Sequence, residues 1–302
     1  MKKNPTLSVV VTAYNEGERL ARCLSSLQKL ADEIIVVDSS STDNTAEVAK
    51  RFTSKVFCQP NYPMLNKNKN YGFSKATGDW ILCLDSDEVI PPELVDEIKQ
   101  QTHHSNIVGY WIPRKNIIFG KWITHGLWWP DKQLRLFVRG MGKYPCKHVH
   151  EYISVDGPTK DLSEPYIHYN YESVSQYLWK MEHIYTQNEV ENLLATGYRL
   201  SWYDAIRFPV SDFLKIYFAQ EGYKDGLHGL VLSLLQSFYS FLVFAKLWEK
   251  QQFREQDIPL SAVSDELKRS SKDFRYWMIT ANIKESSSFI KKFWNKLRRR
   301  TI

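Results

Sequence analysis

Three short apolar runs in the first third of the chain each end in a cluster of polar side chains. The runs cover residues 8–14 (SVVVTAY), 33–38 (EIIVVD) and 80–85 (WILCLD), and they are rich in β-branched and large aliphatic residues. Such short and nearly continuous apolar runs are typical of strands in a parallel sheet that is covered on both faces. We therefore expect three buried parallel strands.

Helical patterns separate these strands. After the first strand, apolar residues recur at helical spacing. They are Leu20, Cys23, Leu24, Leu27 and Leu30. Residues 41–52 begin with capping residues, and residues 91–100 begin with proline in the first turn of a helix. Strands and helices that alternate with short connections predict a doubly wound α/β sheet.

The chain changes character after about residue 105. Residues 109–119, 133–139 and 150–155 are aromatic and extended, and we expect them to add strands and loops that complete one side of a site. From residue 171 onward the pattern is helical.

The polar clusters lie at the carboxyl ends of the expected strands, where open α/β sheets bind ligands. Asp85 and Asp87 project to the same side of an extended segment, so both carboxylates can address one hard cation that also takes phosphate oxygens. If these two aspartates were an isolated feature, a solvated acidic turn would be a sufficient explanation for them. The apolar run ahead of this pair fixes it at the end of a buried strand, which favours a site for a metal and a diphosphate.

Asp38 ends the second strand and precedes small hydroxyl residues. Its carboxylate can accept a hydrogen bond from a base N–H or a ribose hydroxyl. Alternatively, the whole cluster caps the following helix. We expect a division, in which Asp38 binds ligand and Thr42 or Asp43 caps the helix.

Taken together, these segments resemble the family 2 glycosyltransferases of GT-A fold. VVVTAYNE, IIVVDSSSTDNT, a Lys-Asn segment ahead of GDW, and GDWILCLDSDE follow that family's order and approximate spacing. WPDKQLRLF, HVHE and FLKIYFAQEGYKDGLHG are similar to the subgroup that builds bacterial lipopolysaccharide core or related surface glycans. The resemblance implies an α/β fold, with a GT-A-type doubly wound mixed sheet followed by a C-terminal helical extension.

The resemblance also implies a division of labour along the chain. A catalytic domain would cover residues 1–170, with a nucleotide-sugar half at about 1–105 and an acceptor half at about 106–170. A helical, membrane-associating region with a basic tail would cover residues 171–302. The implied reaction moves a sugar from a nucleotide-sugar donor, preferably UDP-linked, to a lipid-linked or lipopolysaccharide-core saccharide, with inversion at the anomeric carbon.

The implied cofactor is a divalent ion, Mg²⁺ or Mn²⁺. The residues implied to contact the nucleotide or its diphosphate are Ala13, Tyr14, Glu16, Asp38, Lys69, Asn70, Asp85 and Arg135. The implied metal ligands are Asp85, Asp87 and His150. Arg135 would either anchor a phosphate through its rigid donor fork or form a structural ion pair.

The acceptor hydroxyl needs a carboxylate or histidine within hydrogen-bond reach to take its proton. Glu151 is the expected base, because it stands where the subgroup carries its HE motif, and His150 would orient it or approach the metal. Asp131 is the second candidate. Glu88 is a weaker one, because a nearby cation would lower its basicity. Alternatively, His148 and His150 only line one face of a strand.

The chain's excess positive charge lies at its C-terminal end. The formal net charge is +6, and the six basic residues of 286–302 account for all of it. This distribution argues against a nucleic-acid-binding body and favours a neutral domain whose cationic tail meets an anionic membrane. Because no cleavable export signal is evident, we expect a cytoplasmic protein that is peripheral on the inner face of the cytoplasmic membrane.

Residues 227–245 carry no formal charge and are long enough to cross a bilayer as a helix. Small and polar residues form a stripe along this segment. They are Gly229, Ser233, Gln236, Ser237 and Ser240. The pattern leaves three alternatives open: a spanning helix, a helix docked at the membrane interface, and a buried packing or dimerisation helix.

Two other functions compete with glycosyl transfer. A non-catalytic, membrane-associated nucleotide-sugar-binding or scaffold protein would keep the fold, although the intact Asp38, Asp85 and Asp87 argue against lost activity. A nucleotidyltransferase would use a similar sheet. The loop TAYNEGERL, however, lacks the glycine-rich, basic stretch expected to cradle a triphosphate.

Overall fold

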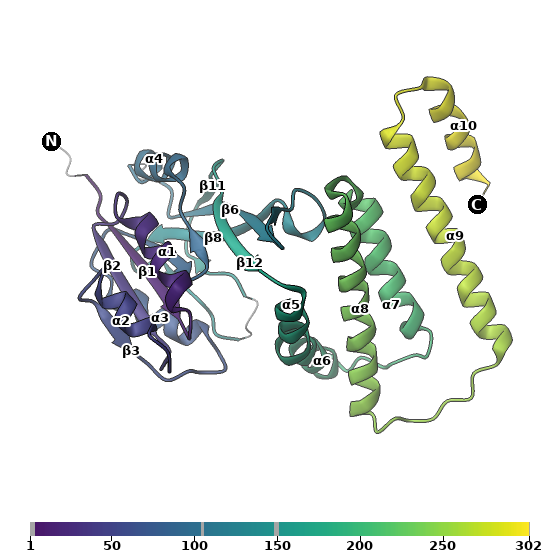
Figure 1. Cartoon of the computed structure of the whole chain (residues 1–302), viewed down its shortest axis with the longest axis horizontal. Helices are drawn as coiled ribbons and strands as arrows, with labels where there is room; N and C mark the ends of the chain where they lie inside the picture. Colours follow the sequence, from purple (N-terminus) through teal and green to yellow (C-terminus); the bar gives the residue numbers. More distant parts are fainter. Residues whose placement is uncertain (1–3, 104–105, 148–150, 302) are drawn as a thin grey trace. The chain divides into compact units, whose positions relative to one another are not determined.

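The structure is a computed structural model that describes residues 4–103, 106–147 and 151–301 (Figure 1). Its strands are β1 (Leu7–Ala13), β2 (Glu33–Asp38), β3 (Val56–Cys58), β4 (Trp80–Asp85), β5 (Glu88–Val89), β6 (Gly109–Ile118), β7 (Lys121–Trp122), β8 (Asp131–Val138), β9 (Gly142–Lys143), β10 (Ser154–Val155), β11 (Thr159–Asp161) and β12 (Tyr166–Tyr171). Its α-helices are α1 (Gly17–Leu27), α2 (Thr45–Lys50), α3 (Asn66–Lys75), α4 (Pro92–Gln101), α5 (Val174–Lys180), α6 (Thr186–Ala195), α7 (Asp204–Phe213), α8 (Leu227–Lys250), α9 (Leu260–Glu285) and α10 (Phe289–Arg300). Short 3-10 helices cover Gly126–Trp128 and Gly222–Asp225, and π-helical turns cover Met181–Tyr185 and Leu214–Ala219.

The chain divides into two compact units. Unit 1 comprises residues 1–117 and 130–170, and it contains the large sheet. Unit 2 comprises residues 118–129 and 171–302, and it contains helices α5 to α10. The excursion at 118–129 therefore groups with the helices of unit 2 before the chain returns to β8 in unit 1.

The sheet of unit 1 has a parallel half and an antiparallel half. Its strand order is β3-β2-β1-β4-β8-β6-β12-β5. Strands β1 to β4 pair in parallel, with Ala13 opposite Asp38 and Thr12 opposite Asp85. Strand β8 pairs antiparallel with both β4 and β6. The parallel half is formed by the three predicted apolar runs and the short β3, and β6 and β8 come from the predicted extended stretches.

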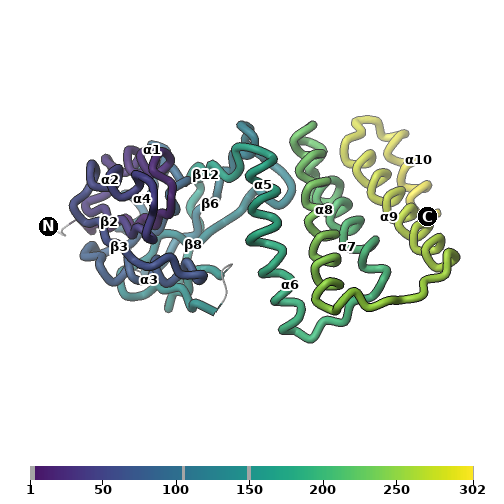
Figure 2. The backbone as a smooth tube through the Cα atoms, turned by 60° about the horizontal axis from the view of Figure 1, so that its bottom comes forward, coloured from purple at the N-terminus to yellow at the C-terminus, as the bar shows by residue number. Residues whose placement is uncertain are grey.

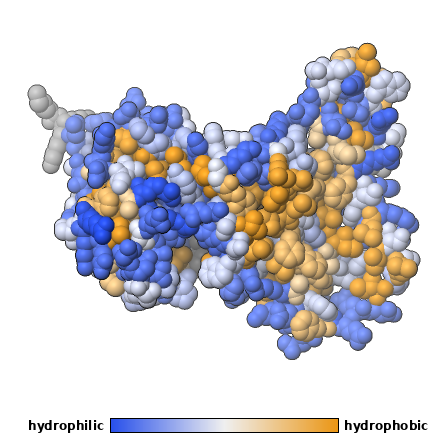
Figure 3. Space-filling view, in the orientation of Figure 1, coloured by the Kyte–Doolittle hydropathy of each residue, from blue (hydrophilic) through white to orange (hydrophobic). Residues whose placement is uncertain are grey.

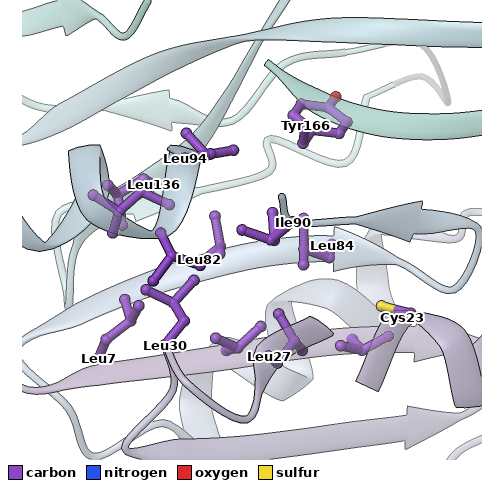
Figure 4. Packing of buried hydrophobic residues seen from close by; sticks show 14 of the residues in the cluster. Leu7, Cys23, Leu27, Leu30, Leu82, Leu84, Ile90, Leu94, Leu136 and Tyr166 are labelled. Carbon is purple, nitrogen blue, oxygen red and sulfur yellow. The ribbon is translucent and has the colours of Figure 1, made fainter. Parts of the chain in front are cut away.

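Helices cover both faces of the parallel half. On one face, α1 and α4 pack apolar side chains such as Leu24 and Leu94 against Leu82 and Leu84 of β4, and part of this core is drawn in Figure 4. On the other face, Phe73 of α3 packs against alternate residues of the same strands. Each strand contributes to both cores, which is why the runs are nearly continuously apolar.

These features confirm the predicted fold class, a doubly wound mixed α/β sheet followed by C-terminal helices. The sequence analysis did not assign α3, because its polar segment, NKNKNYGFSK, lacks an apolar stripe. Gly72 of α3 lies close to β1, where an added Cβ would lie 2.4 Å from Cγ1 of Val10. The helix therefore packs on the sheet through close backbone approach at Gly72 and through the side chain of Phe73.

Unit 2 is built from helices only, apart from the short excursion that contains β7. The predicted helix after residue 171 forms α5 and α6 with a π-helical turn between them. The basic tail is also helical and forms α10. This helix runs beside α9 in both views of the chain (Figure 2). Among the described residues, α8 is the one helix long and apolar enough to cross a membrane, although 28% of its apolar window is buried inside the structure.

Candidate active site

The loops that follow β1 and β2 are joined to each other by hydrogen bonds. Asn15 has a left-handed backbone (φ 52°), and its side-chain oxygen accepts a hydrogen bond from Thr42 N at 2.8 Å. In the same way, Thr45 Oγ1 accepts one from Glu16 N at 2.9 Å. Asp43 accepts hydrogen bonds from Thr45 at the start of α2, so this carboxylate serves the helix N-terminus. These hydrogen bonds tie the carboxyl ends of β1 and β2 together, and we call the two joined loops the rim.

Asp38 is buried in this rim at the end of β2. Asp38 is 3% exposed, and its carboxylate oxygen Oδ2 accepts a hydrogen bond from Ser41 N at 3.2 Å. The other oxygen, Oδ1, has no hydrogen-bond partner among the residues that the structure describes. A buried polar atom without a partner is costly, so an incoming N–H or O–H at this point would relieve that cost.

A buried network of charges surrounds the end of β4. Lys69 Nζ lies 2.6 Å from one oxygen of Asp85, and Arg135 Nη2 lies 2.9 Å from the other. The same Arg135 nitrogen lies 2.6 Å from Glu88 Oε1, and Glu88 also accepts a hydrogen bond from Asp85 N at 2.9 Å. Two cations thus balance two carboxylates in the network.

The pairing in this network changes the proton affinity of its members. Burial raises the pKa of Asp85, but the charges of Lys69 and Arg135 outweigh it and hold that pKa well below its usual range. Burial lowers the pKa of Lys69, but the Asp85 charge outweighs it and raises that pKa above its usual value. Asp85 is therefore ionised and Lys69 is charged at any physiological pH.

Asp87 begins a second chain of polar contacts that leads away from the network. Its Oδ2 lies 3.5 Å from Nε2 of His168 on β12. Nδ1 of that histidine lies 2.7 Å from Oδ1 of Asn116, whose amide nitrogen faces Asp131 at 3.4 Å. Since a carboxylate only accepts, the amide nitrogen must point to Asp131, and Asn116 Oδ1 accepts from the Nδ1–H of His168. This tautomer leaves Nε2 as the nitrogen that faces Asp87.

The residues at Asp87 fit a divalent cation. Within the described part of the chain, no three His, Cys, Asp or Glu side chains converge on one point. A carboxylate oxygen and an imidazole nitrogen do converge, and the other ring nitrogen of His168 is held by Asn116, as is usual for a metal-binding histidine. Mg²⁺ is commonly held by one or two carboxylates and completes its shell with water and substrate phosphates, whereas an imidazole ligand is more typical of transition-metal ions. Asp85 is less available, because both of its oxygens contact cations.

Glu151 is joined to the network through α3. It accepts hydrogen bonds from Asn66 Nδ2 at 3.1 Å, from Lys147 N at 3.0 Å and from Cys146 N. Asn66 lies one helical turn before Lys69, so both side chains lie on the same side of α3. The carboxylate of Glu151 is oriented by these donors beside the helix that supplies a cation to Asp85.

The remaining predicted residues have varied surroundings. Ala13 is buried and pairs with Asp38 between β1 and β2. Tyr14 is 43% exposed. Glu16 forms an ion pair with Arg19 at 2.9 Å. Asn70 exchanges hydrogen bonds with the backbone of Tyr144, each 2.9 Å long.

Two further candidates differ in what the structure shows of them. Asp131 forms an ion pair with Arg114 and accepts a hydrogen bond from Gln133 at 2.8 Å. His150 lies outside the described residues.

The structure thus brings together Lys69, Asp85, Asp87 and Arg135 at one sheet edge. Asp38 lies at the same edge, two strands from Asp85, which is about 10 Å at the usual strand spacing. His168 joins the group, although the sequence analysis did not select it. The sequence feature that could have indicated His168 is a histidine at a buried position of an aromatic strand, YIHYNY, where an imidazole needs polar partners.

The chain is similar in sequence to known glycosyltransferases. The family model described as "Glycosyl transferase family 2" matches residues 8–155. An uncharacterized glycosyltransferase of Rickettsia felis is 28% identical over 262 residues, which cover 80% of this chain and 89% of that protein. The lipopolysaccharide core biosynthesis glycosyltransferase LpsC of Rhizobium meliloti is 26% identical over 255 residues, which cover 82% of this chain and 94% of LpsC. Among solved structures, the mannosyltransferase PcManGT from Pyrobaculum calidifontis in complex with GDP-Man and Mn²⁺ aligns over 98% of this chain and 84% of its own, with 14% identity and a TM-score of 0.43.

Proposed function

Since the chain is a family 2 glycosyltransferase, with the family's domain over residues 8–155, we propose that it transfers a sugar from a nucleotide-sugar donor to a saccharide acceptor with inversion at the anomeric carbon. The proposed donor is UDP-linked. The proposed acceptor is a lipid-linked or lipopolysaccharide-core saccharide, and its relative LpsC, named for core biosynthesis, supports this choice.

One observation carries the proposal. The buried Asp38 oxygen without a partner and the network of Lys69, Asp85 and Arg135 lie at the same edge of one sheet. Asp38 would accept a hydrogen bond from the base or ribose. Lys69 and Arg135, fixed by Asp85, would face the diphosphate with positive charge that needs no rearrangement during the reaction.

We propose Asp87 and His168 as the protein ligands of the divalent ion. When bound, the ion would supply positive charge against the charge that develops on the departing nucleoside diphosphate. Asn116 would keep the His168 ring in the required tautomer, and Asp131 would orient Asn116. This places the two predicted aspartates of the pair in different roles: Asp87 binds the ion, and Asp85 positions the cationic side chains.

Glu151 is the proposed general base. The acceptor oxygen would form a bond to the anomeric carbon as the bond between that carbon and the diphosphate oxygen breaks. The bonding electrons leave with the nucleoside diphosphate, and the acceptor proton passes to the Glu151 carboxylate. Asp131 is the weaker candidate, because its carboxylate is paired with the Arg114 guanidinium, whereas the hydrogen bonds given above for Glu151 come from neutral donors.

A binding and transfer experiment tests the function as a whole. The purified chain is screened by thermal shift against UDP-, GDP- and dTDP-sugars, with and without Mn²⁺, and then assayed for transfer to truncated lipopolysaccharide core. We expect a metal-dependent rise in melting temperature with one donor class, because ligand that binds only the folded state stabilises it. Donor binding without transfer to any acceptor would favour the scaffold alternative, and release of pyrophosphate from a nucleoside triphosphate would favour a nucleotidyltransferase.

Two substitutions test the assigned roles. Asp87→Asn should abolish the metal dependence of donor binding and reduce transfer by at least about 100-fold. The matched control is Asp161→Asn, which breaks an exposed ion pair with Lys132 and should leave both unchanged. Glu151→Gln should keep donor binding and lose transfer. Unchanged transfer in Glu151→Gln would reject this residue as the base.

A further inference from the structure

Helix α10 contacts the rest of unit 2 through polar side chains. Arg299 donates a hydrogen bond to Thr280 Oγ1 of α9 at 3.4 Å, and its guanidinium lies 5.6 Å from the ring centroid of Tyr276. The helix positions with partial burial are Lys292, Asn295 and Arg299. They recur at helical spacing and define a polar stripe that faces α9.

The opposite face of α10 is apolar and exposed. Its members share exposed fractions between 39% and 82%: Phe289, Ile290, Phe293, Trp294 and Leu297. At about 100° per residue they fill an arc of about 140°, and the middle of this arc lies opposite the polar stripe. A surface helix of a globular protein normally turns its apolar face to the core. In α10 the orientation is reversed, so the apolar face needs a partner outside the described fold.

Cations border this apolar face on both sides. Lys291 and Arg298 lie along one edge of the arc, and Lys296 and Arg300 lie along the other. All four are exposed, and the helix contains no acidic residue. Such side chains can extend past an apolar contact to reach anionic groups at its margin.

The apolar face of α10 and the cations along its edges together distinguish between possible binding partners. A second copy of α10 in a symmetric pair would bring the same cations against each other. An anionic lipid surface matches both features, since acyl chains receive the apolar arc and headgroup phosphates meet the cations. We propose that α10 is an interfacial membrane anchor that inserts Phe289, Ile290, Phe293, Trp294 and Leu297 into an anionic leaflet.

Helix α8 shows only a partial reversal, because its buried side carries Leu232, Val243 and Leu247 as well as small and polar residues. Gly229, Ser233 and Ser240, three members of its small and polar stripe, are buried, and Ser237 donates a hydrogen bond to Pro209 O of α7 at 2.6 Å. Its exposed side includes Leu234, Phe238, Phe241 and Trp248. Figure 3 shows apolar residues gathered over this helix. Unit 2 therefore presents apolar side chains outward from α8 as well as from α10.

Vesicle flotation with the full-length protein tests the proposal. We expect binding to vesicles of phosphatidylcholine with about 30% phosphatidylglycerol, and at least tenfold weaker binding to pure phosphatidylcholine. Raising the salt from about 0.1 M to about 0.5 M should weaken binding, because exposed charges are then screened. Equal binding to both compositions would overturn the assignment of the cations.

Variants separate the apolar contact from the charge. Phe293→Ser with Trp294→Ser should weaken vesicle binding about 100-fold, and Lys291→Glu with Arg298→Glu should weaken it at least about tenfold on anionic vesicles. The matched control is Leu260→Ser with Leu267→Ser, which removes two exposed apolar residues from α9 and should leave binding unchanged.

Two results would overturn the proposal. One is flotation of the Phe293→Ser, Trp294→Ser protein like the wild type. The other is a wild-type dimer in analytical ultracentrifugation that this variant converts to monomer, without vesicle binding by either, which would assign the face to a second copy. The flotation assay uses no donor or acceptor, so its failure would leave the proposed glycosyl transfer untouched.

Discussion

In unit 1, charged side chains are buried at the ends of strands, whereas in unit 2 apolar side chains are exposed along helices α8 and α10. Asp85, Glu88 and Arg135 contact one another in unit 1, but Arg135 Nε and Asp38 Oδ1 have no hydrogen-bond partner among the described residues. Phe238 and Phe293 of unit 2 are about half exposed, and neither belongs to the hydrophobic clusters found among the described residues of that unit. Both arrangements depart from the usual pattern of apolar interior and polar surface, and each departure marks a region that requires an outside partner. For unit 1 the proposed partner is a nucleotide sugar, and for unit 2 it is a membrane.

The largest effect is expected from removing the cation at the centre of unit 1. Arg135→Ala removes the cation beside the buried Glu88 carboxylate and leaves Asp85 with Lys69 alone, and should lower the free energy of unfolding by about 3 to 5 kcal/mol. Denaturant titration measures this loss. Lys132→Ala breaks only an exposed pair with Asp161 and should cost less than about 1 kcal/mol. A loss below about 1 kcal/mol for Arg135→Ala would show that buried pairing does not stabilise unit 1.

Unit 2 should be most sensitive where its helices approach closely. An added Cβ at Gly229 of α8 would lie 1.8 Å from the carbonyl oxygen of Gly222. Gly229→Ala should therefore destabilise the protein by about 1 to 3 kcal/mol, although alanine favours a helix over glycine. Leu234→Ala on the exposed side of α8 should change stability by less than about 0.5 kcal/mol in the same titration. Equal losses would mean that the exposed side is also packed.

A positioning residue of unit 1 should affect metal use more than folding. Asn116→Ala removes the acceptor that holds Nδ1 of His168, so the Mn²⁺ concentration for half-maximal transfer should rise about 10- to 100-fold. The rate at saturating Mn²⁺ should recover towards that of the wild type. A reduced rate with an unchanged Mn²⁺ requirement would remove His168 from the proposed metal site.

The smallest effect is expected at the opposite edge of the sheet, at Glu33 at the start of β2. Burial raises its pKa, but hydrogen bonds from Lys55, Ser8 and Thr77 outweigh it and lower the pKa to about 2. Because the folded pKa lies below the unfolded one, the group stabilises the fold above about pH 4.5, and this contribution is lost as the pH falls towards 2. Glu33→Gln should remove about 1 to 2 kcal/mol at neutral pH, after allowance for solvent screening.

Stability measured against pH checks this assignment. The difference between wild type and Glu33→Gln should shrink as the pH falls from 5 to 2, within the range where the protein remains folded. Transfer activity at neutral pH should not change, since Glu33 lies away from the carboxyl edge of the strands. A difference that stays constant with pH would exclude the ionised carboxylate as its cause.

Much of unit 1 was predictable because its signals are local. Buried parallel strands have to be apolar throughout, so the three runs that end at Tyr14, Asp38 and Asp85 identified three strands and the edge at which we propose the site. The sequence also indicated the second carboxylate, Asp87, but not the division of roles that we propose between it and Asp85. Which cation reaches which oxygen depends on Lys69 of α3 and Arg135 of β8, and no local pattern encodes those distances.

The sequence by itself determined the alternation of strands and helices, the polar strand ends, the family resemblance and the location of the basic tail. Tertiary structure alone decided that His168 faces Asp87 and that α10 turns its polar stripe inward. Periodicity reports which residues share a face of a helix or strand, since that follows from backbone geometry. It does not report where that face points, because the direction depends on the elements packed around it.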